Sequence, residues 1–153
     1  MIRHFLIEEG FNYPVGLHIE ENLLAIKEMT DALYLLIDEH YKDCNYVDLI
    51  CRGSSGAIIA GIISFMLASL IEDKKITIYH IKKEGESSHA YLSFPKNFSN
   101  RVRIVVDDFI ITGATIQAIL DKNEDGGELD ILCVSGTIPD KFEDDFIHGI
   151  CKR

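Results

Sequence analysis

The sequence predicts an α/β fold, a single domain with a mostly parallel sheet flanked by helices. Two observations lead to this expectation. The chain has 153 residues, a length typical of one domain. Short apolar runs typical of strands alternate with helical runs. Parallel neighbouring strands need crossover connections, and helices supply them. Ligands of such sheets bind beyond the carboxyl ends of the strands, so the residues that follow each strand are the first candidates for a site.

The bulk composition argues against several classes of function. A net charge of −10 disfavours nucleic acid as a partner, because proteins that bind phosphate backbones collect Lys and Arg on one face. No apolar run reaches the length that a bilayer needs, and the N-terminus does not resemble a leader, so we expect a cytoplasmic protein without a membrane partner. The four cysteines show no C-x-x-C spacing, which favours free thiols over disulfides or a zinc site.

The first third of the chain contains one clear helix. Residues 1–17 are mixed, with a strand-like run at 2–7 followed by turn residues, and we expect them to form a lid or flanking piece. Residues 20–41 place apolar side chains on one side and charged side chains on the other, which predicts an amphipathic helix. We expect His40 to lie in its last turn, near the helix-end carbonyls.

The next segment has a strand, helix, strand pattern. Residues 46–51 predict a strand, 52–55 a tight polar loop, 56–70 an apolar helix and 75–81 a second strand. The polar stretch 82–100 is too long for an ordinary connection. We expect it to be a mobile loop or a hairpin.

The most informative stretch, residues 103–115, reads R-I-V-V-D-D-F-I-I-T-G-A-T. Its β-branched run predicts a strand buried on both faces, and Asp107 and Asp108 follow at the carboxyl end of that strand. Carboxylates there suit sugar hydroxyls and a hard cation. A turn of small residues then opens a helix over 116–120, so that backbone N–H groups can face an anion. The members of the turn are Thr112, Gly113, Ala114 and Thr115.

The acidic pair has two other interpretations. A solvated strand end beside a helix cap would account for an isolated pair of aspartates, but the full order of strand, acids, turn and helix favours a binding site. Receiver domains also carry paired aspartates, but their pair lies on the first strand and the phosphoacceptor lies on a later one. The pair in this chain does not have that arrangement.

The rest of the chain predicts a turn at 125–127, a strand at 128–134 and a short element at 146–151.

This stretch resembles the phosphoribosyl-diphosphate motif of the type I phosphoribosyltransferases. The resemblance implies that Asp107 and Asp108 hold the ribose hydroxyls and Mg²⁺, and that the turn binds the 5-phosphate. Ile110 and Ile111 would complete this part of the substrate site. Ile111 departs from the family pattern, in which a small or polar residue is usual. The 6-oxopurine enzymes have an aspartate there that moves protons on the base, which isoleucine cannot do.

Other segments resemble further parts of the same family's site. Arg52 and Gly53 begin an R-G-S-S-G run similar to the pyrophosphate loop, although a plain polar loop is the alternative. Lys82 and Lys83 resemble the start of the flexible catalytic loop, with a solvated surface loop as the alternative. The resemblance thus implies a catalytic role for Arg52 and both lysines. Phe142 lies in a segment similar to one whose aromatic residue stacks on the purine, unless it packs on the domain edge.

The resemblance covers about residues 46–134 and leaves 1–17 and 136–153 as a hood, the part that chooses the base in this family. It implies a Mg²⁺-dependent enzyme that moves ribose 5-phosphate between phosphoribosyl diphosphate and a nitrogenous base, preferably a purine, with release of pyrophosphate. The implied partners are phosphoribosyl diphosphate, a nucleobase or nucleoside monophosphate, and a second copy in a homodimer. The rival hypotheses are a non-catalytic sensor or regulator that binds the same ligand and, more weakly, a hydrolytic nucleotide-processing enzyme.

Overall fold

The structure is a computed structural model that describes residues 2–6, 19–85, 100–110, 112–123, 129–136 and 146–148. Strands and helices alternate along the chain. Their order is β1 (Ile2–Leu6), α1 (Ile19–His40), β2 (Tyr46–Arg52), α2 (Gly53–Ala68), β3 (Lys75–Ile81), β4 (Arg101–Ile110), α3 (Ala114–Leu120), β5 (Asp130–Gly136) and β6 (Phe146–His148).

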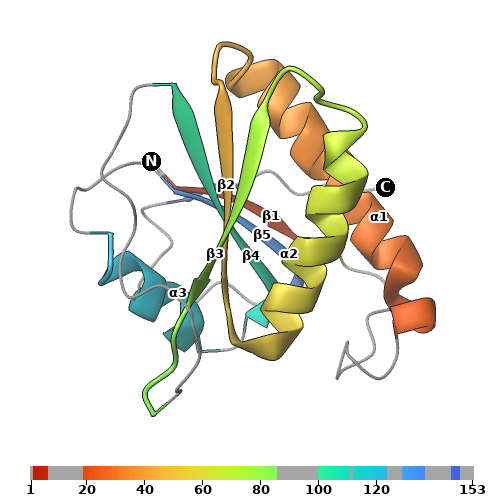
Figure 1. Ribbon diagram of the computed structural model, residues 1–153. Helices are drawn as coiled ribbons and strands as arrows, with labels where there is room; N and C mark the ends of the chain where they lie inside the picture. Colours follow the sequence, from red (N-terminus) through yellow and green to blue (C-terminus); the bar gives the residue numbers. More distant parts are fainter. Residues whose placement is uncertain are drawn as a thin grey trace.

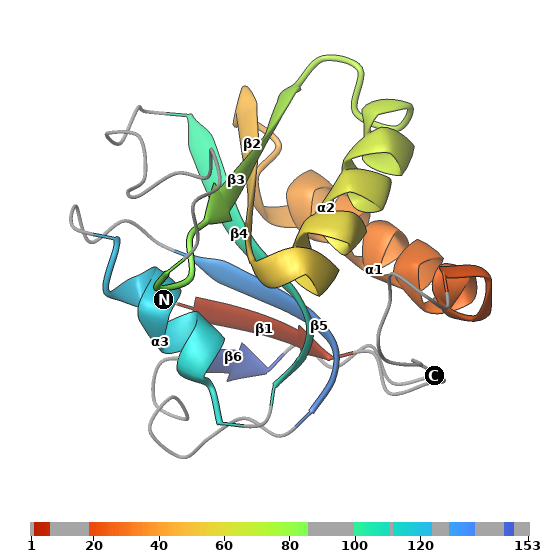
Figure 2. The same cartoon turned by 60° about the horizontal axis from the view of Figure 1, so that its bottom comes forward.

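The strands form one six-stranded sheet in the order β3-β2-β4-β5-β1-β6, and every neighbouring pair is parallel. Helices α1 and α2 lie on one face of the sheet, and α3 lies on the other (Figures 1 and 2). Parallel pairing aligns the carboxyl ends of β2, β3 and β4 at one edge. The predicted fold class, an α/β domain with a parallel sheet flanked by helices, is confirmed.

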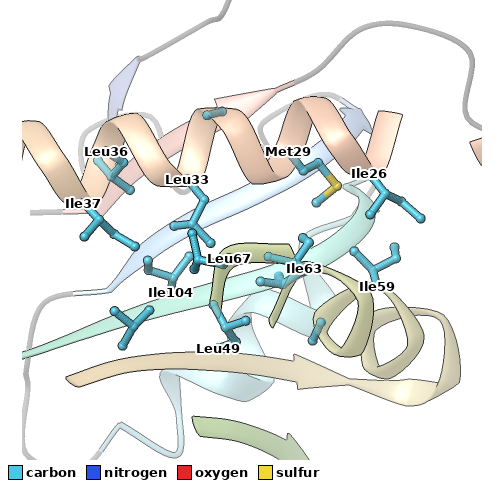
Figure 3. Close-up of a cluster of buried hydrophobic side chains, with 14 of the residues drawn as sticks. Ile26, Met29, Leu33, Leu36, Ile37, Leu49, Ile59, Ile63, Leu67 and Ile104 are labelled. Atoms are coloured by element: carbon cyan, nitrogen blue, oxygen red, sulfur yellow. The ribbon is translucent and has the colours of Figure 1, made fainter. Parts of the chain in front are cut away.

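The main core lies between the sheet and the helices α1 and α2. Alternate residues of β2 and β4, among them Leu49 and Ile104, point to this side. Figure 3 shows them facing Leu33 of α1 and Ile63 and Leu67 of α2. All five side chains are fully buried. Each contributes about 1.5–3 kcal/mol relative to an exposed position, so this layer holds the sheet against the two helices.

Helix α1 confirms the amphipathic pattern that the sequence predicts over residues 20–41. Its inward side chains Ile26, Met29 and Leu33 are fully buried, whereas Lys27 and Asp31 form an exposed ion pair at 3.3 Å. His40 lies in its last turn. Within the described residues, no helix is long and apolar enough to cross a membrane.

The predicted loop over residues 52–55 is wrong. Helix α2 begins at Gly53, immediately after the last residue of β2. The backbone of Gly53 has a φ of +81°, a conformation that glycine adopts at little cost, and it turns the chain from strand to helix within one residue. The first turn of α2 is therefore held directly at the carboxyl edge of the sheet.

Strand β4 extends further than the sequence predicts. Asp107 and Asp108 were expected to follow the strand, but they lie within it, because β4 continues to pair with β5 as far as Ile110 and Gly136. The ladder fixes the backbone of both acids. Their positions are thus set by the sheet and not by a loop.

The expectation that both chain ends form a hood needs a correction. Residues 2–6 are a strand, as predicted, but β1 lies inside the sheet between β5 and β6, and β6 adds residues 146–148. This pairing joins segments that are far apart in sequence, so no local pattern could predict it. The rest of both end segments, and most of the predicted mobile loop 82–100, lie outside the described residues.

Candidate active site

A pocket of about 340 Å³ lies at the carboxyl edge of the sheet, where β2, β3 and β4 end. Such a volume suits a small organic ligand. The pocket gathers residues from four separate stretches of sequence. Its lining consists of Arg52, Gly53, Ser54, Ser55, Gly56, Lys83, Asp107, Asp108, Thr112, Gly113, Ala114, Thr115 and Ile116.

The two aspartates form the buried acidic wall of the pocket. Asp107 and Asp108 are 7% and 6% exposed. The backbone N–H of Asp108 donates to Oδ1 of Asp107 at 3.0 Å. Burial, hydrogen bonding with the Asp108 side chain and the negative charge of Asp108 raise the pKa of Asp107 to about 8, against smaller lowering effects of that backbone N–H and of Lys83. The pocket therefore holds a carboxyl group that a cationic ligand would help to ionise.

The start of α2 forms a second wall, close to the acids. A Cβ atom at Gly56 would lie 3.3 Å from the carbonyl oxygen of Val106 and 3.8 Å from Oδ1 of Asp107. A glycine therefore allows the first turn of the helix to approach β4. Arg52 lines the same wall, and its buried Nε has no hydrogen-bond partner among the described residues. Its guanidinium group has donor capacity left for an anion.

Lys83 reaches over the beginning of α2. A Cβ atom at Gly53 would lie 2.9 Å from both Cε and Nζ of Lys83, so the flexible end of this lysine packs closely against the glycine. The lysine charge also lowers the pKa of Asp107, which places it within electrostatic reach of the acids. Lys82 follows β3 directly but does not line the pocket. The sequence assigned the same role to Lys82 and Lys83, but only Lys83 lines the pocket.

The small-residue turn closes the third side of the pocket. Gly113 has a φ of +68°, and the Oγ1 atom of Thr112 accepts a hydrogen bond from the backbone N–H of Ala114 at 3.3 Å. The turn is therefore held in a defined shape by its own side chain. All four of its residues, 112–115, line the pocket.

Some predicted site residues lie outside the described part of the chain, and some pocket residues were not predicted. Ile110 is the last residue of β4, and its side chain is outside the described part of the chain, as are Ile111 and Phe142 altogether. Conversely, Ser54, Ser55, Gly56 and Ile116 line the pocket although the sequence analysis did not assign them to the site. The R-G-S-S-G run contained the first three, but their role depends on α2 starting at Gly53.

The described residues contain no group of three or more His, Cys, Asp or Glu side chains that could hold a metal ion. The two pocket aspartates could supply two ligands, and a bound molecule would have to supply others. Cys51 lies behind the pocket and is fully buried. Burial, together with the charge of Asp107, raises its pKa to about 12, so this thiol stays protonated and packs as a small apolar group.

Known structures share this architecture. The chain is similar to a purine phosphoribosyltransferase from Pyrococcus horikoshii, with 18% identity, a TM-score of 0.50 and coverage of 83% of this chain and 82% of that one. It is also similar to the hypoxanthine-guanine phosphoribosyltransferase from Schistosoma mansoni in complex with IMP, with 14% identity, a TM-score of 0.51 and coverage of 96% and 80%. The fold is that of the type I phosphoribosyltransferases.

The phosphoribosyltransferase fold accounts for the parallel sheet with its pocket at the carboxyl edge. No protein-family model matches the sequence, and no curated protein matches it. At such low identity the structural similarity shows the fold alone. The activity has to be argued from the residues of the pocket.

Proposed function

We propose that this protein is a phosphoribosyltransferase that moves ribose 5-phosphate between phosphoribosyl diphosphate and a nitrogen of a base. The observation that carries the proposal is the composition of one pocket. It combines a buried acid pair, an arginine and a lysine, the first turn of α2, and the T-G-A-T turn. This set offers acceptors for sugar hydroxyls and donors for two separate phosphate groups.

In the proposed reaction the bond between C1 of the ribose and the diphosphate oxygen breaks, and a bond from C1 to a base nitrogen forms. Positive charge develops on the sugar and negative charge on the leaving diphosphate, so fixed cations and N–H groups near the diphosphate would stabilise the transition state. Arg52, Lys83 and the first turn of α2 would take that role, while the turn at 112–115 would bind the 5-phosphate. Lys82, expected to share the catalytic role, would act when the segment after β3 closes over the diphosphate.

The acid pair has the donor chemistry for Mg²⁺. This ion commonly takes one or two protein carboxylates and completes its shell with water and substrate phosphates. Asp107 and Asp108 supply such a pair, and their mutual repulsion in a buried position would be relieved by a cation. When bound, Mg²⁺ would neutralise charge on the diphosphate. The carboxylates would also accept hydrogen bonds from the ribose hydroxyls.

The nature of the base belongs to the same proposal. Both structural neighbours carry purine names, and one is described in complex with IMP, which supports a purine as the base. Ile111 stands where the 6-oxopurine enzymes have an aspartate, so proton movement on the base would require another group. Phe142 would stack on the base. We further propose that the protein works as a homodimer in the cytoplasm and that end-segment residues outside the described strands choose the base.

Pyrophosphate release from phosphoribosyl diphosphate across a panel of purine and pyrimidine bases tests the proposal. We expect release with at least one purine in the presence of Mg²⁺, and loss of release in the Asp107→Asn/Asp108→Asn variant. Release that is independent of added base would indicate hydrolysis instead. Absence of release with every base, under conditions in which phosphoribosyl diphosphate binds, would exclude the transferase.

One observation favours a second candidate. Because isoleucine at position 111 cannot exchange protons, the chain could keep the sugar-phosphate site without turnover. A sensor or regulator of this kind would bind phosphoribosyl diphosphate or a nucleotide and release no pyrophosphate. Calorimetry of phosphoribosyl diphosphate binding, together with the base panel, distinguishes the two functions.

A further inference from the structure

Helix α2 contains two glycines whose backbone is helical, Gly56 in its first turn and Gly61 halfway along. Glycine inside a helix is unfavourable relative to alanine, because it loses more conformational freedom on folding. Neither residue has a positive φ, so the backbone conformation does not require glycine at either position. The remaining structural reason for a glycine in such a place is the close approach of neighbouring atoms.

The surroundings of the two glycines differ. A Cβ atom at Gly61 would meet no atom within 4 Å. A Cβ atom at Gly56 would lie 3.3 Å from the carbonyl oxygen of Val106 on β4 and 3.4 Å from the Cβ atom of Cys51 on β2. These two strands are neighbours in the sheet, so Gly56 lies against both of them. Ordinary contacts of a Cβ atom begin at 3.4 Å, and the contact with Val106 would be tighter than that.

The sheet is the more rigid partner in this contact. Strand β2 lies between β3 and β4, and β4 lies between β2 and β5, so hydrogen-bonded neighbours hold both strands on both sides. Val106 itself pairs with Leu132 of β5. Helix α2 is held against the sheet by side-chain packing instead. A methyl group at position 56 would therefore shift the first turn of α2 away from β4 by a few tenths of an ångström.

Such a shift would separate two walls of the pocket. We call residues 52–56 the α2 wall. The side chain of Arg52, the N-cap residue, makes no capping hydrogen bond, so the N–H groups of the first turn are available to an anion. Oδ1 of Asp107 would lie 3.8 Å from the Cβ atom at Gly56, so the α2 wall and the acid pair are within contact distance there. One wall offers donors for a phosphate group, and the other offers acceptors for hydroxyl groups.

We propose that Gly56 is a positioning residue that sets the separation between the α2 wall and the acid pair, and that this separation selects a sugar whose diphosphate is attached next to its hydroxyl groups. This inference rests on the proposed function and specifies the substrate class of that site. In phosphoribosyl diphosphate the diphosphate is on C1 and the first ring hydroxyl is on the adjacent carbon, C2. Such a ligand contacts both walls at once only when the walls are close together.

Two ligands separate the contributions of the walls. Ribose 5-phosphate carries the ring hydroxyls and the 5-phosphate but no diphosphate, so it would contact the acid pair and the turn at 112–115. Phosphoribosyl diphosphate would make the same contacts and would also reach the α2 wall. The ratio of the two affinities therefore depends on where the α2 wall lies relative to the acid pair. A general loss of stability would not change this ratio.

Calorimetry of the wild type, Gly56→Ala and Gly61→Ala with both ligands, in the presence of Mg²⁺, tests the proposal. We expect Gly56→Ala to weaken binding of phosphoribosyl diphosphate about five- to tenfold, because a misplacement of about 1 Å can cost about a hundredfold and the expected shift is smaller. Its affinity for ribose 5-phosphate should be unchanged. Gly61→Ala makes the same substitution without a close neighbour, so it is the matched control and should leave both affinities unchanged.

Thermal unfolding without ligand measures the contact itself. Gly61→Ala should raise Tm by about 2–4 °C, because alanine is the better helix former. Gly56→Ala should gain less, because its methyl group presses against Val106, but the gain in helix propensity keeps the variant folded. Equal gains in the two variants would mean that the methyl group at position 56 is accommodated without a shift of α2, and the proposal would be wrong.

The possible failures are distinguishable. If Gly56→Ala changes both affinities by the same factor, or changes neither, Gly56 does not set this separation. A fall of the ratio in Gly61→Ala as large as in Gly56→Ala would also contradict the proposal, because the contact with Val106 would then not be the cause. A wild-type protein that binds phosphoribosyl diphosphate but releases no pyrophosphate with any base would exclude the transferase and leave this inference intact. A wild-type protein that binds neither ligand would overturn both.

Discussion

Strand β4 carries buried charged residues at both ends, and comparing the ends distinguishes a structural arrangement from a functional one. At its start, Nη1 of Arg101 donates to both carboxylate oxygens of Asp48, at 2.5 and 2.7 Å. At its end, two carboxylates, Asp107 and Asp108, lie next to each other in the wall of a pocket. Opposite charges meet at the first end, whereas two acidic groups meet at the second.

The pKa shifts reflect this difference. Burial raises the pKa of Asp48, whereas its hydrogen bonds with Arg101 lower it, and the same contact raises the pKa of Arg101. These charges stabilise each other inside the protein. The pKa of Asp107 is raised to about 8 by burial and by its acidic neighbour. Acidic groups whose pKa is raised in this way cluster at functional sites.

The largest expected effect concerns the structural end. Replacing Arg101 by Met leaves the carboxylate of Asp48, which is 1% exposed, without its ion-pair partner. Removing one member of a buried pair typically costs about 3–5 kcal/mol of unfolding free energy. Urea unfolding of Arg101→Met should therefore show a loss of that size.

The matched control removes both charges. Arg101→Met/Asp48→Leu should recover much of the loss, because a well-packed apolar pair can replace a buried ion pair. If the double variant is as unstable as the single one, packing around Arg101 is the cause and the structural assignment of the pair is wrong.

The acidic pair should behave in the opposite way. In Asp107→Asn/Asp108→Asn we expect affinity for phosphoribosyl diphosphate with Mg²⁺ to fall by at least ~2 kcal/mol, about thirtyfold, because hydroxyl and metal ligands are lost. Unfolding free energy should not fall with it. Calorimetry and urea unfolding measure both quantities, and unchanged affinity would remove these residues from the proposed site.

The buried carboxyl group of Asp107 should lower the stability of the folded protein in a pH-dependent way. Because its folded pKa of about 8 is above the ordinary value of about 4, the folded protein retains the proton more strongly, and its stability falls as pH rises through that window. Asparagine resembles the protonated form. Asp107→Asn should therefore gain about 1–3 kcal/mol over the wild type near pH 8 and little near pH 4.

Thermal unfolding of both proteins at several pH values measures this difference. It should grow from about pH 4 to about pH 8 and then level off. A difference that is constant across the window would mean that Asp107 is ionised in the folded protein throughout.

The sequence predicted which residues form the site better than it predicted the helix start and the strand order around them. The β-branched run, the acid pair and the turn 112–115 were recognisable because each has a local chemical signature. The start of α2 was not, since it depends on the positive φ of Gly53, which turns the chain from strand to helix within one residue. Insertion of β1 between β5 and β6 depends on pairing between distant segments. Ser54 was not predicted as a site residue, because it lines the pocket only when α2 begins at Gly53.

The smallest expected effect concerns Lys82 and Lys83, the two lysines that follow β3. Only Lys83 lines the pocket and lies over Gly53, whereas Lys82 does not reach the lining. If Lys83 stabilises charge that develops on the leaving diphosphate, Lys83→Ala should lower kcat about tenfold, near 1.4 kcal/mol, and weaken nucleoside monophosphate binding less. Lys82→Ala is the matched control, with the same charge removed one residue away, and its kcat should fall less. Steady-state kinetics and monophosphate titration, both at a protein concentration that keeps the oligomeric state constant, measure the contrast. Equal losses in the two variants would contradict a distinct role for the position of Lys83 over the first turn of α2.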